Sequence, residues 1–202
     1  MGKKIYDITK ELFSSEVYFG DPSPSLTRIQ EIKKGDECNL SMLTMCLHNG
    51  THIDAPCHFL DGEKDITTLD LESVIGDCIV VEWSGLLDEN SARTVMDRLL
   101  KKYGIVKRLL LKGRDVVLNL GGATVLTNYD LCLIGVEKST VGDEREQEDV
   151  EQVHRHLLKN EIVILESLDL SQVKEGAYML LAQPLKIQGA DGAPCRAILL
   201  EA

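Results

Sequence analysis

The chain has 202 residues, of which 44% are hydrophobic and 27% are charged, and its formal net charge is −11. This length fits one globular domain, spanning residues 1–202, with a sizeable core. The negative charge argues against nucleic acid as a general partner, because phosphate backbones repel it. No stretch approaches the roughly eighteen apolar residues of a membrane span, so no membrane partner is expected either.

The N-terminus and the cysteines indicate a reducing compartment. The first ten residues, MGKKIYDITK, lack the apolar segment of a secretory signal. Tyr6 stands where a myristoylation motif requires Ser or Thr. The six cysteines form no C-x-x-C pair, which favours free thiols. We therefore predict a cytoplasmic protein.

The first half of the chain predicts a loop, three strands and a helix. Residues 19–25, FGDPSPS, have the composition of a loop. Residues 40–48 alternate loosely and predict a strand, as do the apolar runs at 77–83 and 106–112. One face of the first strand would carry Met42, Thr44, Cys46 and His48.

A helix is predicted over residues 90–104. Asn90 or Ser91 would cap its N-terminus, basic residues fill its last turn, and Gly104 would end it.

The second half predicts four strands and one helix. The helix covers 150–160, and the acidic run before and into it, 142–152, indicates a solvated helix face. The strands are 130–137, 161–168, 176–187 and 195–201. Together these elements predict a mixed α/β domain with antiparallel pairing near both ends.

Residues 47–60, LHNGTHIDAPCHFL, concentrate ligand-type side chains. In an extended segment His52 and Asp54 point the same way, and a turn at Gly50 lets His48 converge on them. Two imidazoles and one carboxylate suit Zn²⁺, Mn²⁺ or Fe²⁺ and leave a position open for water. A metal there could make hydroxide available at neutral pH. His58 is a further ligand or the group that transfers protons.

A second group of candidates lies later in the chain. His154 falls on the predicted helix and Glu166 near the end of the strand that follows, so the two side chains could meet at the sheet edge. Glu166 sits in an apolar run and needs a partner, because burying an unpaired charge is costly. The alternative is a salt-bridged Glu166 with His154 on the surface.

The motif from His48 to Phe59 resembles the H-x-G-T-H-x-D-x-P-x-H-F signature of the cyclase family, whose best-known members are bacterial kynurenine formamidases (arylformamidases). The resemblance extends to IYDIT near the start, to VYFGDPSP, and to the C-terminal third. It implies a swivelling β/β/α fold, with a mixed, largely antiparallel sheet, in a homodimer or homotetramer.

The resemblance also implies a role for each matched residue. His48, His52 and Asp54 would bind a first divalent metal, and Asp54 would bridge to a second. His154 and Glu166 would complete that second site. The expected ions are zinc, with manganese as the alternative. His58 would be the catalytic acid/base and Tyr18 would contact substrate.

The implied reaction is hydrolysis of an aryl formamide or related amide by attack of metal-bound hydroxide. Three departures from the family pattern leave the substrate open. Tyr18 replaces a tryptophan, Glu137 replaces an aspartate, and residues 112–130, which in the family help shape the substrate pocket, match poorly. N-formylkynurenine and a cyclic amide of the isatin type are both candidates.

Two other interpretations compete with the metal-dependent hydrolase. One is a cysteine hydrolase that uses Cys57 or Cys46, although Cys57 and its neighbour His58 would point apart on a strand. The other is a non-catalytic protein that binds a metal or ligand at the same residues.

Overall fold

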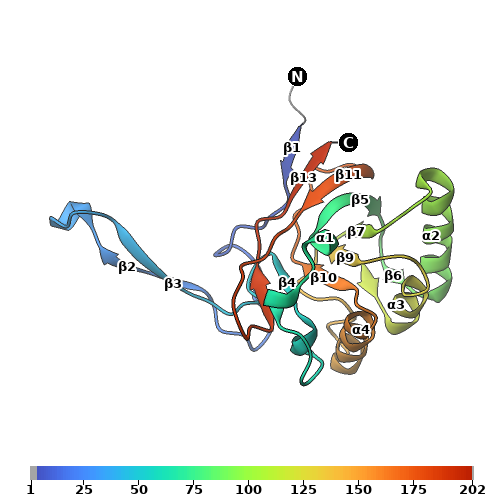
Figure 1. Ribbon diagram of the computed structural model, residues 1–202, viewed down its shortest axis with the longest axis horizontal. Coiled ribbons are helices and arrows are strands. Elements are labelled where there is room, and N and C mark those ends of the chain that lie inside the picture. The colour runs from blue at the N-terminus through green and yellow to red at the C-terminus, as the bar shows by residue number, and fades with distance from the viewer. Residues whose placement is uncertain (1–3, 202) are drawn as a thin grey trace.

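The computed structural model describes residues 4–201, which fold around a nine-stranded sheet of order β1-β13-β11-β5-β7-β9-β10-β4-β12 (Figure 1). The strands are β1 (Ile5–Asp7), β4 (His52–Asp54), β5 (Ile75–Glu82), β7 (Arg108–Lys112), β9 (Leu133–Val136), β10 (Val163–Glu166), β11 (Gly176–Leu181), β12 (Gly192–Pro194) and β13 (Ile198–Glu201). Five of the eight pairings are antiparallel, and the three that join β5, β7, β9 and β10 are parallel. The mixed, largely antiparallel α/β fold predicted from the sequence is confirmed.

Central strands are buried on both faces, and their side chains alternate between two cores. On β7, Leu109 and Leu111 face one core and Leu110 faces the other. The first core is covered by helices that lie together on one side of the sheet in Figure 1. These helices are α2 (Glu89–Tyr103), α3 (Leu120–Leu126) and α4 (Gln147–Lys159).

The second core closes the other face of the sheet. It joins Ile53 of β4 to Leu199 of β13, although these strands lie near opposite edges. The sheet therefore curls around this core, which gives the β/β/α layering of the expected fold. Short elements complete the chain: α1 (Leu71–Val74), the parallel pair β6 (Leu86–Leu87) and β8 (Val117–Leu118), and the 3₁₀ turns Ile32–Lys34, Pro56–His58 and Ile66–Thr68.

Helix α2 matches the predicted helix, but its cap lies elsewhere. Asp88 is the cap, and its carboxylate accepts the Ser91 N–H at 2.9 Å while the Ser91 hydroxyl accepts the Asp88 N–H at 2.8 Å. Gly104 follows the last turn with a φ of +79°. The prediction of Asn90 or Ser91 as the cap was wrong by two or three residues because the reciprocal Asp88–Ser91 pair satisfies more backbone donors.

Observed strands are shorter than the predicted ones. The strand predicted over 161–168 ends at Glu166, where Ser167 turns into the left-handed region with a φ of +56°. The strand predicted over 176–187 ends at Leu181, three residues before Pro184. The acidic run 142–152 is mostly exposed, as predicted, although only its second half is helical because α4 begins at Gln147.

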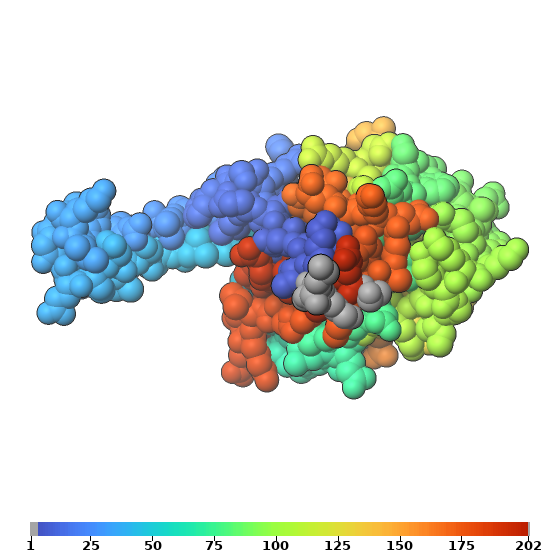
Figure 2. All heavy atoms as spheres, turned by 90° about the horizontal axis from the view of Figure 1, so that it is seen from above, coloured from blue at the N-terminus to red at the C-terminus, as the bar shows by residue number. Residues whose placement is uncertain are grey.

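A two-stranded arm projects from the body and differs most from expectation. Strands β2 (Ser25–Gln30) and β3 (Leu40–Thr44) pair only with each other and form the long extension in Figures 1 and 2. Every residue of both strands is exposed. The strand predicted over 40–48 therefore ends at Thr44, and Cys46 and His48 belong to the turns that follow.

No helix between residues 4 and 201 combines the length and the apolar character that crossing a membrane requires.

Candidate metal centre

Strand β4 places His52 and Asp54 on the same face of the sheet, as their spacing predicts. The strand lies between β10 and β12, and its register sets His52 opposite Glu166. Directly opposed residues of antiparallel strands project to the same side, so the Glu166 carboxylate joins the pair. All three side chains are buried, with no more than 3% of any residue exposed.

The turn before β4 brings in His48. Gly50 adopts a φ of +69°, a conformation that favours glycine, and reverses the chain between His48 and His52. The Thr51 hydroxyl anchors this turn by donating to the Ser167 carbonyl at 2.5 Å. His48 Nδ1 then lies 3.0 Å from Asp54 Oδ1, so the predicted convergence is confirmed.

Gly192 of β12 makes room for the His48 ring. A Cβ atom on this glycine would lie 2.7 Å from His48 Cε1 and 2.9 Å from the Ile53 carbonyl oxygen. The ring therefore packs directly against the β12 backbone.

Helix α4 supplies His154 to the same group of side chains. Its Nε2 lies 3.4 Å from Glu166 Oε1 and 3.5 Å from Asp54 Oδ2. His154 is buried beside these carboxylates, so the alternative that placed it on the surface was wrong.

Backbone carbonyls set the tautomers of the two most buried histidines. His52 Nδ1 donates to the Gly50 carbonyl at 2.8 Å, and His154 Nδ1 donates to the Val150 carbonyl at 2.7 Å. A carbonyl oxygen only accepts, so each ring holds its proton on Nδ1 and turns Nε2 toward the carboxylates. Such outer hydrogen bonds are typical of histidines that ligate metals.

The donor atoms themselves test whether a cation fits. Across residues 4–201, three buried side-chain atoms lack a hydrogen-bond partner, and two of them are His52 Nε2 and Asp54 Oδ2. Unsatisfied buried polar atoms are rare in folded proteins, and here they point into the shared space between carboxylates and imidazoles. Ligand atoms of His52, Asp54 and Glu166 lie within 4.8 Å of one another, as do those of His48, Asp54 and His58. These residues could hold a divalent metal ion.

The buried charges at the site also indicate that a cation would fit there. Burial on its own lowers the pKa of His52, but the Asp54 and Glu166 carboxylates outweigh it and raise that pKa to about 10. The same holds for His48. Burial lowers its pKa, but the Asp191 and Asp54 carboxylates outweigh burial and raise that pKa to about 9. Two buried carboxylates need positive charge beside them, and either histidine protons or metal ions can supply it.

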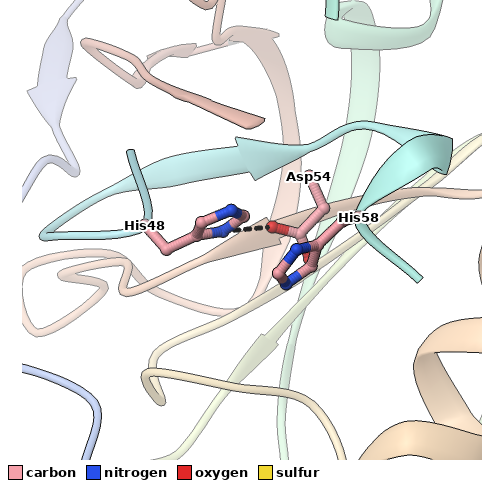
Figure 3. A group of neighbouring side chains, drawn as sticks. All are labelled: His48, Asp54 and His58. Atoms are coloured by element: carbon pink, nitrogen blue, oxygen red, sulfur yellow. Dashed lines mark hydrogen bonds and ion pairs between the residues drawn. The ribbon is translucent and has the colours of Figure 1, made fainter. Parts of the chain in front are cut away.

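His58 lies at the edge of this cluster, on the 3₁₀ turn after β4. Its ring stacks on His48 with centroids 4.0 Å apart, and 27% of its side chain is exposed. Figure 3 shows its imidazole beside His48 and the Asp54 carboxylate. Burial lowers the pKa of His58. His58, the residue predicted to transfer protons, is thus more accessible than His48, His52 and His154.

A cavity of about 250 Å³ is lined by His48, His52, His58, His154 and Glu166. Tyr18, the residue expected to contact substrate, lines it and donates its hydroxyl hydrogen to Gln147 Oε1 at 2.9 Å. Among the described residues, none from 112–130 lines this cavity. Glu137 also lies outside it, where its carboxylate accepts the N–H groups of Gly113 and Leu170. Two of the three departures from the family pattern therefore lie outside the lining of this cavity.

The cysteines do not form a nucleophilic pair with histidine. Cys46 lines the cavity, but its thiol faces Asp21 Oδ2 at 3.6 Å, and the Cys57 thiol faces the Ala190 carbonyl at 3.7 Å. Burial raises the pKa of both thiols, which disfavours the thiolate.

Asp191 is the site residue that sequence reasoning missed. Its Oδ2 lies 3.0 Å from His48 Nε2 and 3.3 Å from His58 Nδ1. It follows Gly189-Ala190 in a short polar loop, more than 130 residues beyond the histidines, so no local pattern links it to them. Only the pairing of β12 with β4 brings it to the site.

Comparison with known proteins agrees with this geometry. The family model described as "Putative cyclase" matches residues 6–122. The chain is 34% identical to a kynurenine formamidase of Erythrobacter litoralis, over 98% of this chain and 94% of the relative, and 34% identical to cyclase-like protein 2 of Oryza sativa subsp. japonica, over 99% and 80%. A solved structure described as a potential metal-dependent hydrolase with cyclase activity superposes with a TM-score of 0.81 at 25% identity, covering 99% of this chain and 98% of that one. The chain therefore belongs to the cyclase family, a family of hydrolases, as its motif predicts.

Proposed function

We propose that this chain is a metal-dependent amidohydrolase that cleaves an aryl formamide, with N-formylkynurenine as the first substrate to test. The observation that carries the proposal is the convergence of His48, His52, Asp54, His154 and Glu166, with unpaired donor atoms at its centre. The choice of substrate is supported by the relative named kynurenine formamidase, which matches over nearly the full length of both chains.

We propose two divalent ions per chain, zinc first and manganese as the alternative. Each carboxylate offers one oxygen to each buried histidine. Asp54 Oδ1 lies 3.3 Å from His52 Nε2, and Glu166 Oε2 lies 3.4 Å from the same atom. The other oxygens, Asp54 Oδ2 and Glu166 Oε1, face His154 Nε2. Two carboxylates that bridge two imidazoles in this way favour a pair of ions, with His48 on the His52 side.

Ions held there would activate a water molecule and polarise the formyl carbonyl. Hydrolysis adds water across the C–N bond, so formate leaves and the aryl amine must gain a proton. His58 is the accessible imidazole beside the cluster, and it would pass that proton to the nitrogen. Tyr18, which lines the same cavity, would lie against the aromatic ring of the substrate.

The test is hydrolysis by protein purified without a histidine tag or chelator. We expect turnover of N-formylkynurenine, loss of activity with chelator, and recovery on adding Zn²⁺ or Mn²⁺. An isatin-type lactam is tested in the same assay. Hydrolysis of the lactam in place of the formamide would favour the alternative, a cyclic-amide hydrolase. Inactivation by thiol alkylation, with chelator harmless, would point to the cysteine hydrolase instead. Bound metal without hydrolysis of any aryl amide would make the chain a non-catalytic binding protein.

We also propose that two copies associate through the arm, residues 25–44. Six large apolar side chains on it are between 47% and 57% exposed: Leu26, Ile29, Ile32, Leu40, Met42 and Leu43. An isolated two-stranded ribbon is marginally stable, so this arm needs a surface to pack against. Phe13 and Phe19 are exposed in the segment that leads into it. One chain thus offers both halves of a self-complementary contact, as a two-fold dimer requires.

We place the enzyme in the cytoplasm, with a small amide as its substrate and with neither nucleic acid nor membrane as a partner. The location is supported by the cysteines: all six lie in the described part of the chain and all are free.

A further inference from the structure

The loop that carries Asp191 is held rigidly against the metal centre. The Asp191 carbonyl accepts the Ala55 N–H at 2.8 Å, and the next residue, Gly192, pairs with Asp54 across the ladder. On the other side, the Asp65 carboxylate accepts the Gly189 N–H at 2.6 Å. The Asp191 side chain therefore extends from a backbone that is bonded on both sides, although 48% of the side chain itself is exposed.

One oxygen of this carboxylate serves two histidines. Asp191 Oδ2 lies 3.0 Å from His48 Nε2 and 3.3 Å from His58 Nδ1. The two rings stack with an interplanar angle of 22°, which brings one nitrogen of each ring close to the same oxygen. The contact to His48 is a hydrogen bond, whereas the contact to His58 is an ion pair. A negative charge that lies this close favours a proton on the facing nitrogen of each ring.

The opposite nitrogens then have defined roles. With the His48 proton held on Nε2, its Nδ1 lone pair faces Asp54 Oδ1 and the metal position. With the His58 proton held on Nδ1, its Nε2 lone pair is free to accept a proton. The His48 ring separates Asp191 from Asp54, so Asp191 lies outside the group of shared carboxylates.

We propose that Asp191 is a positioning residue that fixes the tautomers of both His48 and His58, so that one carboxylate couples the metal ligand to the acid/base. The coupling to catalysis rests on the proposed hydrolase function, whereas the tautomer assignment does not. Carboxylates that orient metal-bound histidines typically change metal affinity or activity by about 10- to 100-fold when removed.

The experiment compares Asp191→Asn and Asp191→Ala with Asp65→Asn, a control that loosens the same loop without touching a histidine. Imidazole ¹⁵N spectra of the zinc-loaded protein report the tautomers directly. We expect His48 and His58 to change tautomer population in both Asp191 variants and to stay unchanged in the control. Asparagine retains one acceptor, so its effect should be smaller than that of alanine.

Kinetics and zinc competition against a chelator complete the test. We expect kcat to fall about 10- to 100-fold with KM little changed, and zinc affinity to fall in the same order of variants. Unchanged histidine spectra in both Asp191 variants would overturn the proposal, even if activity fell. If the wild-type protein hydrolyses no formamide, the proposed function fails, but the spectra still decide the role of Asp191. If Asp191→Ala does not fold, the spectra of Asp191→Asn and of the control decide it.

Discussion

The metal centre and the arm both depart from the usual distribution of side chains between core and surface, in opposite ways. At the centre, charged and polar side chains are buried, and two of their atoms have no hydrogen-bond partner in the described chain. On the arm, apolar side chains are exposed, and the two strands pair only with each other. The rest of the molecule follows the usual rule, with two apolar cores on the faces of one sheet.

Both departures are costly for a chain on its own. Buried carboxylates and imidazoles are costly unless positive charge compensates them, and exposed leucines are costly unless another surface covers them. Ions would compensate the centre, and we propose that a second copy of the chain covers the arm. The two regions are also adjacent in sequence: the arm begins after Tyr18 and Asp21 and ends before Cys46 and His48, all of which line the cavity.

The largest effect is expected from Asp54→Asn. Within residues 4–201, Asp54 is the only carboxylate that contacts His48, His52 and His154 together, so both proposed ions should bind poorly to the variant. We expect metal content to fall toward zero and activity to drop by more than about 100-fold, beyond what the loss of an outer partner costs. Elemental analysis and steady-state kinetics measure both. Asp130→Asn, on the exposed Lys107 ion pair, is the matched control and should change neither.

His58→Ala should separate chemistry from metal binding. We expect the metal content to stay near the wild-type value while kcat falls about 10²- to 10⁴-fold, the usual contribution of a general acid/base. His58 lies close enough to His48 and Asp54 to be a ligand itself. Loss of metal from this variant would show that it is one.

Glu166→Ala should lower the metal content per chain. Each of its oxygens faces a buried histidine, so its removal should weaken both proposed metal positions, although Asp54 would still contact both. We expect about half the metal, or less, by elemental analysis of dialysed protein. An unchanged metal-to-chain ratio would remove Glu166 from the site.

Gly192→Ala should displace the His48 ring and so disturb the metal centre. The added methyl group would meet the His48 ring and the Ile53 carbonyl, so we expect a loss of about 1–3 kcal/mol in unfolding free energy and weaker metal retention. Thermal and chelator-induced unfolding measure these. Gly176→Ala in β11 is the control, because its nearest neighbour would lie 3.7 Å away. Equal behaviour of the two variants would show that the close packing on His48 has no consequence.

The smallest effect on the stability of the folded chain is expected from substitutions in the arm. Met42→Lys and Leu43→Lys change exposed side chains, so the unfolding free energy of the monomer should change by no more than about 0.5 kcal/mol. Their dimer should nevertheless dissociate at concentrations where the wild type stays associated, as measured by light scattering. Ile105→Lys, which is also exposed but lies outside the arm, should leave association intact. A wild-type monomer at high concentration would end the dimer proposal.

Much of the site was predictable because several of the candidate metal ligands lie close together in one sequence motif. His48, His52 and Asp54 lie within seven residues, and the period-two spacing and the turn at Gly50 are local properties of the chain. His154 and Glu166 could be proposed only as a pair, since their contact depends on the packing of α4 on β10. Asp191 could not be predicted, because strand pairing between β4 and β12 is a long-range feature.

The fold class was predictable from alternating helices and apolar strands, but the arm was not. Residues 40–48 have the alternation of a half-buried strand, and alternation alone does not tell a sheet face from a surface that a second chain would cover. Strand ends were the other weak point, since Ser167 leaves the extended region without a glycine or proline to signal it.

The metal assignment is tested most sharply by the metal content per chain, measured with N-formylkynurenine hydrolysis on the same untagged sample. We predict about two divalent ions per chain together with turnover that chelation abolishes. A chain without metal whose activity survives chelator would contradict the assignment of His48, His52, Asp54, His154 and Glu166.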